Sequence, residues 1–239
     1  MSESQKSIVF AVALAIICSV LLTLAATGLR PFKMRNVAID MQKNVLKSVQ
    51  LVQTDKSYTD QWIEKTYTEN IQCLYVDEAG SIIDEKDRRE TDLPLCLYKP
   101  EKNIEAYIIP INTRGLWGKI EGYLALEKDG STVKGFTVYK HNETPGLGGE
   151  IEQAWFQKNF QGKKIIDENG DFVSISIAKG VISKDMPQDK RSHYVDGISG
   201  ATLTGKYLTV GFKEILLEYE PVSIKFRKYQ GKPPVSELD

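Results

Sequence analysis

The sequence is poor in the residues that build metal centres and nucleophilic sites. It has three cysteines and two histidines in 239 residues. Cys73 and Cys96 stand far apart and outside any Cys-x-x-Cys pair, so no metal site is expected from them. Only His141 and His193 could serve as the base of a serine hydrolase. Ala201 replaces the last glycine of a Gly-x-Ser-x-Gly pattern, so this class of enzyme is not expected either.

The sequence also has no large excess of positive or negative charge. The formal net charge is −1, which gives no indication of the basic face that nucleic-acid binding requires. The charge is nevertheless uneven along the chain. Residues 1–35 hold four basic residues against one acidic residue, so the excess of negative charge lies in residues 36–239.

Residues 8–29 form an uncharged and mostly apolar run. At 1.5 Å per residue, these 22 residues can cross the ~30 Å hydrocarbon layer of a membrane. The small residues 25–27 would also suit a signal-peptide cleavage site, but the apolar cores of signal peptides have about 7–15 residues. We therefore expect a short tail over residues 1–7 and a retained transmembrane helix over residues 8–29. More basic residues follow the helix than precede it, which by the positive-inside tendency favours a cytoplasmic domain.

Residues 30–57 are expected to form a linker and an amphipathic helix. Apolar residues repeat at helical spacing over residues 35–52, at Val37, Met41, Val45, Val49 and Val52. Residues 58–239 then make up one domain, which begins with a short helix capped by Ser57.

Alternating residues and turn signals in this domain predict an α+β fold with an antiparallel sheet. Residues 120–126 alternate, Asp129-Gly130 marks a turn, and residues 132–140 return as a second strand. The apolar strand expected over residues 106–111 contains Pro110, which suits an edge strand or the end of a strand. Further strands are expected over residues 72–76, 81–83, 172–177 and 222–226, and helices over residues 150–160 and 203–219.

The remaining soluble segments give less specific indications. The charged run over residues 84–92 predicts a solvated loop. Lys232-Pro233-Pro234 predicts a loose tail. Cys73 and Cys96 are expected either to pair, if the compartment is oxidising, or to be buried as free thiols.

A segment rich in small residues, Val195 to Thr204, precedes the last amphipathic helix. Small side chains let a ligand approach the backbone closely. The free N–H groups and the dipole at a helix N-terminus favour an anion such as phosphate. The alternative is that Ser199 or Thr202 is only the N-cap of the helix.

A second glycine-rich stretch covers residues 144–149, with the sequence Thr-Pro-Gly-Leu-Gly-Gly. It lacks the Gly-Lys-Ser/Thr of a Walker phosphate loop, and no parallel βαβ unit surrounds it as in a dinucleotide-binding fold. Its glycines would let the backbone lie against a planar ring, and Leu147 could cover a ring face.

Three stretches occur in one order: Gly115-Leu116-Trp117, then Glu143 to Glu150, then Asp-Gly-Ile-Ser-Gly-Ala-Thr ending at Thr202. With the N-terminal segment ending Gly28-Leu29-Arg30, they resemble the C subunit of the sodium-translocating NADH:quinone reductase. The resemblance implies a half-barrel-like sheet and an FMN that a flavin transferase attaches through its phosphate to Thr202. It also implies cofactor-binding roles for Trp117, Glu143, Thr144, Gly146, Leu147, Gly148, Ser199, Gly200, Ala201, Leu203 and Thr204.

The same resemblance implies a one-electron relay within a sodium-pumping complex, with no NADH site, metal or catalytic residue on this chain. Its partners would be the other subunits, the flavin transferase during maturation, and the membrane. The family places the domain outside the bacterial inner membrane, and we follow this placement against the charge count. The G subunit of the Rnf electron-transport complex, which shares two of the motifs, is the nearest alternative. A flavin-binding membrane sensor is an alternative of another class.

Overall fold

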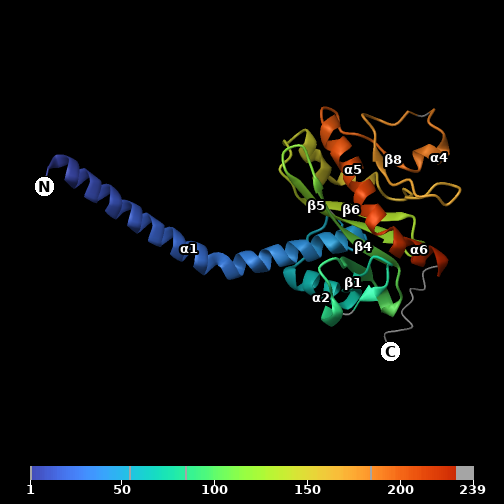
Figure 1. Cartoon of the computed structure of the whole chain (residues 1–239), viewed down its shortest axis with the longest axis horizontal. Helices are drawn as coiled ribbons and strands as arrows, with labels where there is room; N and C mark the ends of the chain where they lie inside the picture. The colour runs from blue at the N-terminus through green and yellow to red at the C-terminus, as the bar shows by residue number, and fades with distance from the viewer. Residues whose placement is uncertain (1, 54, 84, 184, 230–239) are drawn as a thin grey trace. The chain divides into compact units, whose positions relative to one another are not determined.

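The computed structural model describes residues 2–53, 55–83, 85–183 and 185–229 (Figure 1). The loose tail expected around residues 232–234 lies outside this range. The chain divides into two units, Met1–Asp40 and Met41–Asp239. The second unit carries the sheets, the shorter helices and the candidate site.

Helix α1 (Glu3–Ser48) runs without interruption through the apolar stretch. Among the described residues it is the one helix that is long and apolar enough to cross a membrane. Pro31 lies inside α1, so the linker expected after residue 29 is helical instead. α1 ends at Ser48 rather than at the predicted residue 52, because Gln50 takes a left-handed conformation with a φ of 68° that ends the helix.

The beginning of the second unit follows the predicted apolar stripe in part. Three of its residues are buried: Val45, Val49 and Val52. Helix α2 (Asp60–Asn70) begins after Thr59, whose hydroxyl accepts a hydrogen bond from the Trp62 backbone N–H at 3.3 Å. The predicted cap at Ser57 was therefore wrong by two residues.

Six antiparallel strands form the main sheet, in the order β2-β1-β3-β4-β5-β6. They are β1 Ile71–Val76, β2 Ile82–Ile83, β3 Leu93–Tyr98, β4 Ala106–Arg114, β5 Lys119–Glu127 and β6 Val133–Lys140. β4 and β5 pair over their whole length, from Ala106↔Glu127 to Arg114↔Lys119. The α+β class, the antiparallel sheet and the hairpin of residues 120–140 are thereby confirmed.

Pro110 explains why β3 and β4 pair only partly. Their pairing runs from Tyr98↔Ala106 to Cys96↔Ile108 and then ends. Pro110 lies beyond this point, and a proline has no N–H to donate to a strand ladder. β4 is interior in the strand order and continues past Pro110 to Arg114, so it is neither an edge strand nor at its end there. Only its pairing with β3 stops before Pro110.

The connection after the site loop is less regular than predicted. The helix expected over residues 150–160 is divided at Gln153 into a 3-10 segment, Gly148–Glu152, and helix α3, Ala154–Lys158. Trp155 of α3 is 47% exposed. The strand expected over residues 172–177 is reduced to β7 (Ser176–Ile177), which pairs in parallel with β8 (Tyr194–Val195).

The last predicted strand, residues 222–226, is part of helix α6 (Glu220–Lys228). Val222 and Phe226 are buried four residues apart, whereas Ile224 between them is 38% exposed, which is the burial pattern of a helix. Helix α5 (Thr202–Glu218) precedes it and confirms the helix expected over residues 203–219. The remaining elements are α4 Gln188–Arg191 and the 3-10 segments Glu85–Asp87 and Pro100–Lys102.

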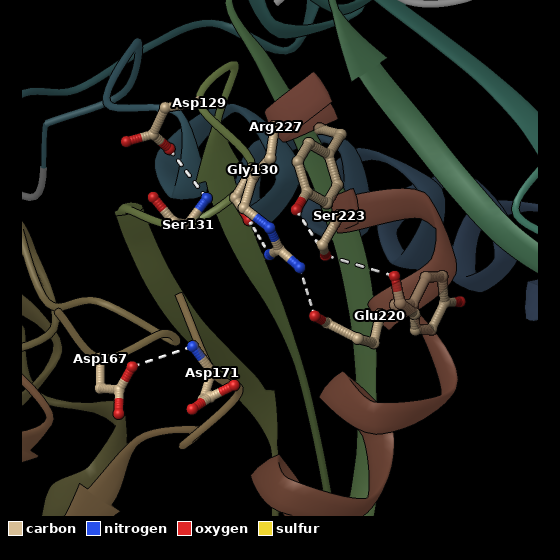
Figure 2. A network of polar contacts seen from close by, with 10 residues as sticks. Asp129, Gly130, Ser131, Asp167, Asp171, Glu220, Ser223 and Arg227 are labelled. Atoms are coloured by element: carbon tan, nitrogen blue, oxygen red, sulfur yellow. Dashed lines mark hydrogen bonds and ion pairs between the residues drawn. The ribbon is translucent and has the colours of Figure 1, made fainter. Parts of the chain in front are cut away.

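Polar contacts fasten α6 to the sheet, as Figure 2 shows. The Arg227 guanidinium donates to the Gly130 carbonyl at 2.9 Å and pairs with Glu220. The Ser223 hydroxyl shares a 2.8 Å hydrogen bond with the Tyr107 hydroxyl of β4. Complete burial raises the pKa of Tyr107, so this phenol stays protonated and can keep the bond. α6 is therefore held both at the β5–β6 turn and at the sheet itself.

Cys73 and Cys96 lie opposite each other on β1 and β3 and form a disulfide. This decides between the two expectations, a pair or two free thiols. The charged run before β3 was expected to be solvated, and most of its described residues are exposed. Asp92 is the exception. Its buried carboxylate accepts hydrogen bonds from the Arg89 backbone at 2.7 Å and from the Arg89 guanidinium at 3.0 Å.

Candidate functional site

The N-terminus of α5 lies at the centre of the candidate site. α5 packs on the sheet through three fully buried side chains: Leu208, Phe212 and Leu216. Ala201 is the residue before its first turn, and no side chain caps the helix there. The simple N-cap role considered for Ser199 or Thr202 is therefore not observed. Gly200 has a φ of 75°, a conformation that glycine adopts without strain.

One close contact sets the position of α5 on the sheet. Gly211 lies over Thr113 of β4, and a Cβ built at Gly211 would stand 1.9 Å from the Thr113 Oγ1. We expect Gly211→Ala to lower the free energy of unfolding by about 1–3 kcal/mol, because α5 must lift from the strand. Urea unfolding of the full chain in detergent measures this change. A Thr113→Ala substitution should recover part of the loss, and a Gly211→Ala chain as stable as the parent would contradict the prediction.

Two threonines in the first turn of α5 have opposite environments. Thr202 is exposed, so its hydroxyl is accessible to another molecule. Thr204 is 2% exposed, and its hydroxyl donates to the Glu143 Oε2 at 2.5 Å. The first turn thus exposes Thr202 and buries Thr204.

Glu143 connects the three motifs. It is 5% exposed, and its Oε1 accepts a hydrogen bond from the Trp117 backbone N–H at 3.1 Å. With Thr204 bound to Oε2, one side chain holds the loop after β4 and the start of α5. Its own backbone N–H donates to the His141 Nδ1 at 3.1 Å.

Two glycines leave space for the Glu143 carboxylate. A Cβ at Gly115 would lie 2.5 Å from Oε1, and a Cβ at Gly148 would lie 2.6 Å from Oε2. Any larger residue at these positions would displace the carboxylate. The glycines of the first and second motifs are thus needed for the contact that joins these motifs to α5.

A cavity of about 310 Å³ opens between the three motifs. Its volume is at the lower end of the range for small-molecule pockets. It is lined by Leu116, Trp117, Glu143, Thr144, Leu147, Gly148, Gly200, Ala201, Thr202, Leu203 and Thr204. The structure therefore brings together most of the predicted site residues, whereas Ser199 and Gly146 lie outside the lining. Leu116 was not predicted, although its place beside Trp117 in the first motif could have indicated it.

The lining combines two kinds of surface. Three apolar side chains are largely exposed around the cavity: Trp117 at 67%, Leu203 at 51% and Leu147 at 43%. The N-terminus of α5 adds free N–H groups and a positive dipole end. Such a site can hold a flat apolar group with an anionic group attached. Within the described residues, no group of three or more His, Cys, Asp or Glu side chains could hold a metal ion.

Comparison with known proteins agrees with this geometry. The model of the FMN-binding domain family matches residues 115–216, which include all three motifs. The C subunit of the Na(+)-translocating NADH-quinone reductase from Vibrio campbellii is 33% identical, over 84% of this chain and 86% of that protein. The same subunit from Pseudomonas aeruginosa is 29% identical, over 85% of this chain and 88% of the relative.

Solved structures show the same fold. The crystal structure of the C subunit of the Na(+)-translocating NADH-quinone reductase from Parabacteroides distasonis is 28% identical, with a TM-score of 0.69. It covers 82% of this chain and 96% of its own. Shewanella oneidensis NqrC, at 21% identity and a TM-score of 0.65, shares the fold. From the sequence identity and the coverage together, this chain belongs to the family of the C subunit of the Na(+)-translocating NADH-quinone reductase.

Proposed function

We propose that this chain is a membrane-anchored electron-transfer subunit of a sodium-pumping NADH:quinone reductase, carrying FMN covalently on Thr202. The observation that carries the proposal is the contrast between the two threonines of α5. Thr202 is exposed in the cavity lining, whereas Thr204 is buried and bound to Glu143. A phosphoester at Thr202 Oγ1 would put the phosphate of FMN at the positive end of the α5 dipole.

The other residues of the site suit the rest of the cofactor. Trp117, Leu147 and Leu203 offer apolar surface for the ring system, and they line one cavity with Thr202. Thr144 and Gly148 also line this cavity. Bound FMN would supply the redox chemistry, and the protein would supply position, shielding from water and electrostatics.

Partners follow from the same proposal. The relatives named above are subunits of a larger enzyme, so electron donors and acceptors would be other subunits of that complex. This favours the quinone-reductase branch over the G subunit of the Rnf complex and over a sensor. No dinucleotide fingerprint occurs in the sequence, so NADH would bind elsewhere in the complex. A flavin transferase would be needed to load Thr202.

The test is expression of the full chain with and without a flavin transferase. With the transferase, the denatured protein should fluoresce as a flavin on a gel; without it, the band should be dark. Trypsin would cleave after Arg191 and Lys206, so one peptide contains both threonines, and its fragmentation should place the FMN phosphate on Thr202. A dark band in the presence of an active transferase would reject the proposal.

Membrane orientation is a separate part of the proposal. We expect the N-terminus in the cytoplasm, a single span by α1 in the inner membrane, and the domain on the outer side. The Cys73–Cys96 disulfide supports this placement, because disulfides persist in oxidising compartments. The basic residues after the span oppose it. A reporter enzyme that works only in the cytoplasm should be silent when fused after residue 239; an active fusion would show that the charge count is right.

A further inference from the structure

Both carboxylate oxygens of Glu143 are bonded to the protein itself. Oε1 accepts from the Trp117 backbone, and Oε2 accepts from the Thr204 hydroxyl. These partners lie 26 residues before it and 61 residues after it in the chain. This carboxylate therefore holds two walls of the cavity together. The role comes in addition to the cofactor contact expected from the sequence, since Glu143 also lines the cavity.

The carboxylate of Glu143 is held by neutral groups and not by an ion pair among the described residues. Within the part of the chain that the structure describes, no Lys, Arg or His side chain forms an ion pair with Glu143. His141 accepts at Nδ1 from the Glu143 backbone N–H and makes no ion pair with the Glu143 carboxylate. The other ring nitrogen of His141 is bonded to the Glu152 carboxylate at 3.2 Å. Two neutral donors thus hold a buried negative charge beside the cavity.

We propose that Glu143 is a positioning residue whose buried negative charge also lowers the reduction potential of the cofactor. This inference rests on the proposed FMN site. Each electron that enters FMN adds one negative charge to it when no proton follows. A fixed carboxylate in the lining of the same cavity opposes this addition, and burial weakens the screening by water and salt. Neutral donors set the place of the charge without cancelling it.

Glu143→Gln tests the role of the charge. The amide keeps the shape of the side chain. Its oxygen can accept from Trp117, and its NH2 group can donate to the Thr204 hydroxyl. We expect the variant to retain covalent FMN. The equilibrium constant for one-electron reduction of its flavin should be at least tenfold larger than in the parent at fixed pH, which corresponds to a rise of about 59 mV in the reduction potential. The measurement is a redox titration of the flavin absorbance in the loaded chain.

Glu214→Gln is the matched control, since it removes the same charge from an exposed position on α5. Its potential should stay near that of the parent, because solvent screens an exposed charge. An unchanged potential in Glu143→Gln would overturn the electrostatic role. Loss of FMN from Glu143→Gln alone would also overturn it, since the carboxylate itself would then be needed for loading.

The positioning role is tested without any cofactor. In protein made without flavin transferase, Glu143→Ala should speed hydrogen exchange of the Trp117 amide at least tenfold, because that N–H loses its acceptor. Glu143→Gln should leave this rate near the parent value. The amide of Phe212, in the core of α5, is the internal reference. An unchanged Trp117 rate in the alanine variant, or an equal acceleration at Phe212, would overturn the positioning role. Failure of the FMN proposal would instead appear as a parent chain that cannot be loaded.

Discussion

Thr202→Val should abolish covalent FMN, whereas Thr204→Val should leave it in place. Valine keeps the shape of threonine and removes the hydroxyl, so the two variants differ only in which hydroxyl is lost. Thr202 is exposed in the cavity lining, and Thr204 is 2% exposed and already donates to Glu143. The measurement is flavin fluorescence of the denatured band after co-expression with the transferase.

Two further outcomes sharpen this prediction. Thr202→Ser restores a hydroxyl at the same position and should recover at least part of the fluorescence, which valine cannot do. Thr204→Val leaves the Glu143 Oε2 without its donor, so some loss of stability is expected even when loading is normal. A fluorescent Thr202→Val band would show that another side chain is the acceptor. Ser199, also exposed and three residues earlier, would then be the first candidate.

The parts of the fold that could be predicted are those whose signal lies within a few residues. Helix α5 was recognisable because its apolar residues repeat at helical spacing, and Leu208, Phe212 and Leu216 are indeed fully buried. The β5–β6 hairpin was recognisable from alternation on both sides of Asp129-Gly130. Periodicity and turn chemistry are local properties, so one sequence is enough to read them.

Short apolar runs were ambiguous for a physical reason. Residues 222–226 alternate Val-Ser-Ile-Lys-Phe, which fits a strand, yet Val222 and Phe226 are also four residues apart, which fits a helix. Pro221, in the first turn of α6, was the signal for a helix start that the prediction did not use. Tertiary contacts of α6, such as that of Ser223 with Tyr107, then determine which face is buried.

The contacts inside the site could not be predicted from the sequence, for another reason. The sequence motifs indicated which segments would meet, but the Glu143–Thr204 hydrogen bond joins residues 61 positions apart. Nothing local shows that a glutamate holds the walls of its cavity together. This role became visible only from the positions of both carboxylate oxygens, which leave no room for a side chain at Gly115 or Gly148.

Replacing both Cys73 and Cys96 with alanine should lower the free energy of unfolding by about 3 kcal/mol, because the disulfide closes a loop across 23 positions of the chain and restricts the unfolded state. The bond lies in the middle of the β1–β3 pairing, which runs from Ile71↔Tyr98 to Val76↔Leu93. Its loss should therefore loosen β2, β1 and β3, the strands at the end of the sheet opposite β6. Urea unfolding of the full chain in detergent, without reductant, measures the change.

Cys18→Ala is the matched control, since Cys18 is a free and exposed cysteine of α1 and its loss should leave the unfolding curve of the domain unchanged. The same three cysteines also report the compartment. If the domain lies outside the inner membrane, a thiol-reactive probe added to acid-quenched and denatured chain should label Cys18 alone, because the other two are paired. Labelling of all three would mean that the bond is absent in the cell. Parent and double variant should then unfold alike even without reductant, and both the stability prediction and the outer placement of the domain would be contradicted together.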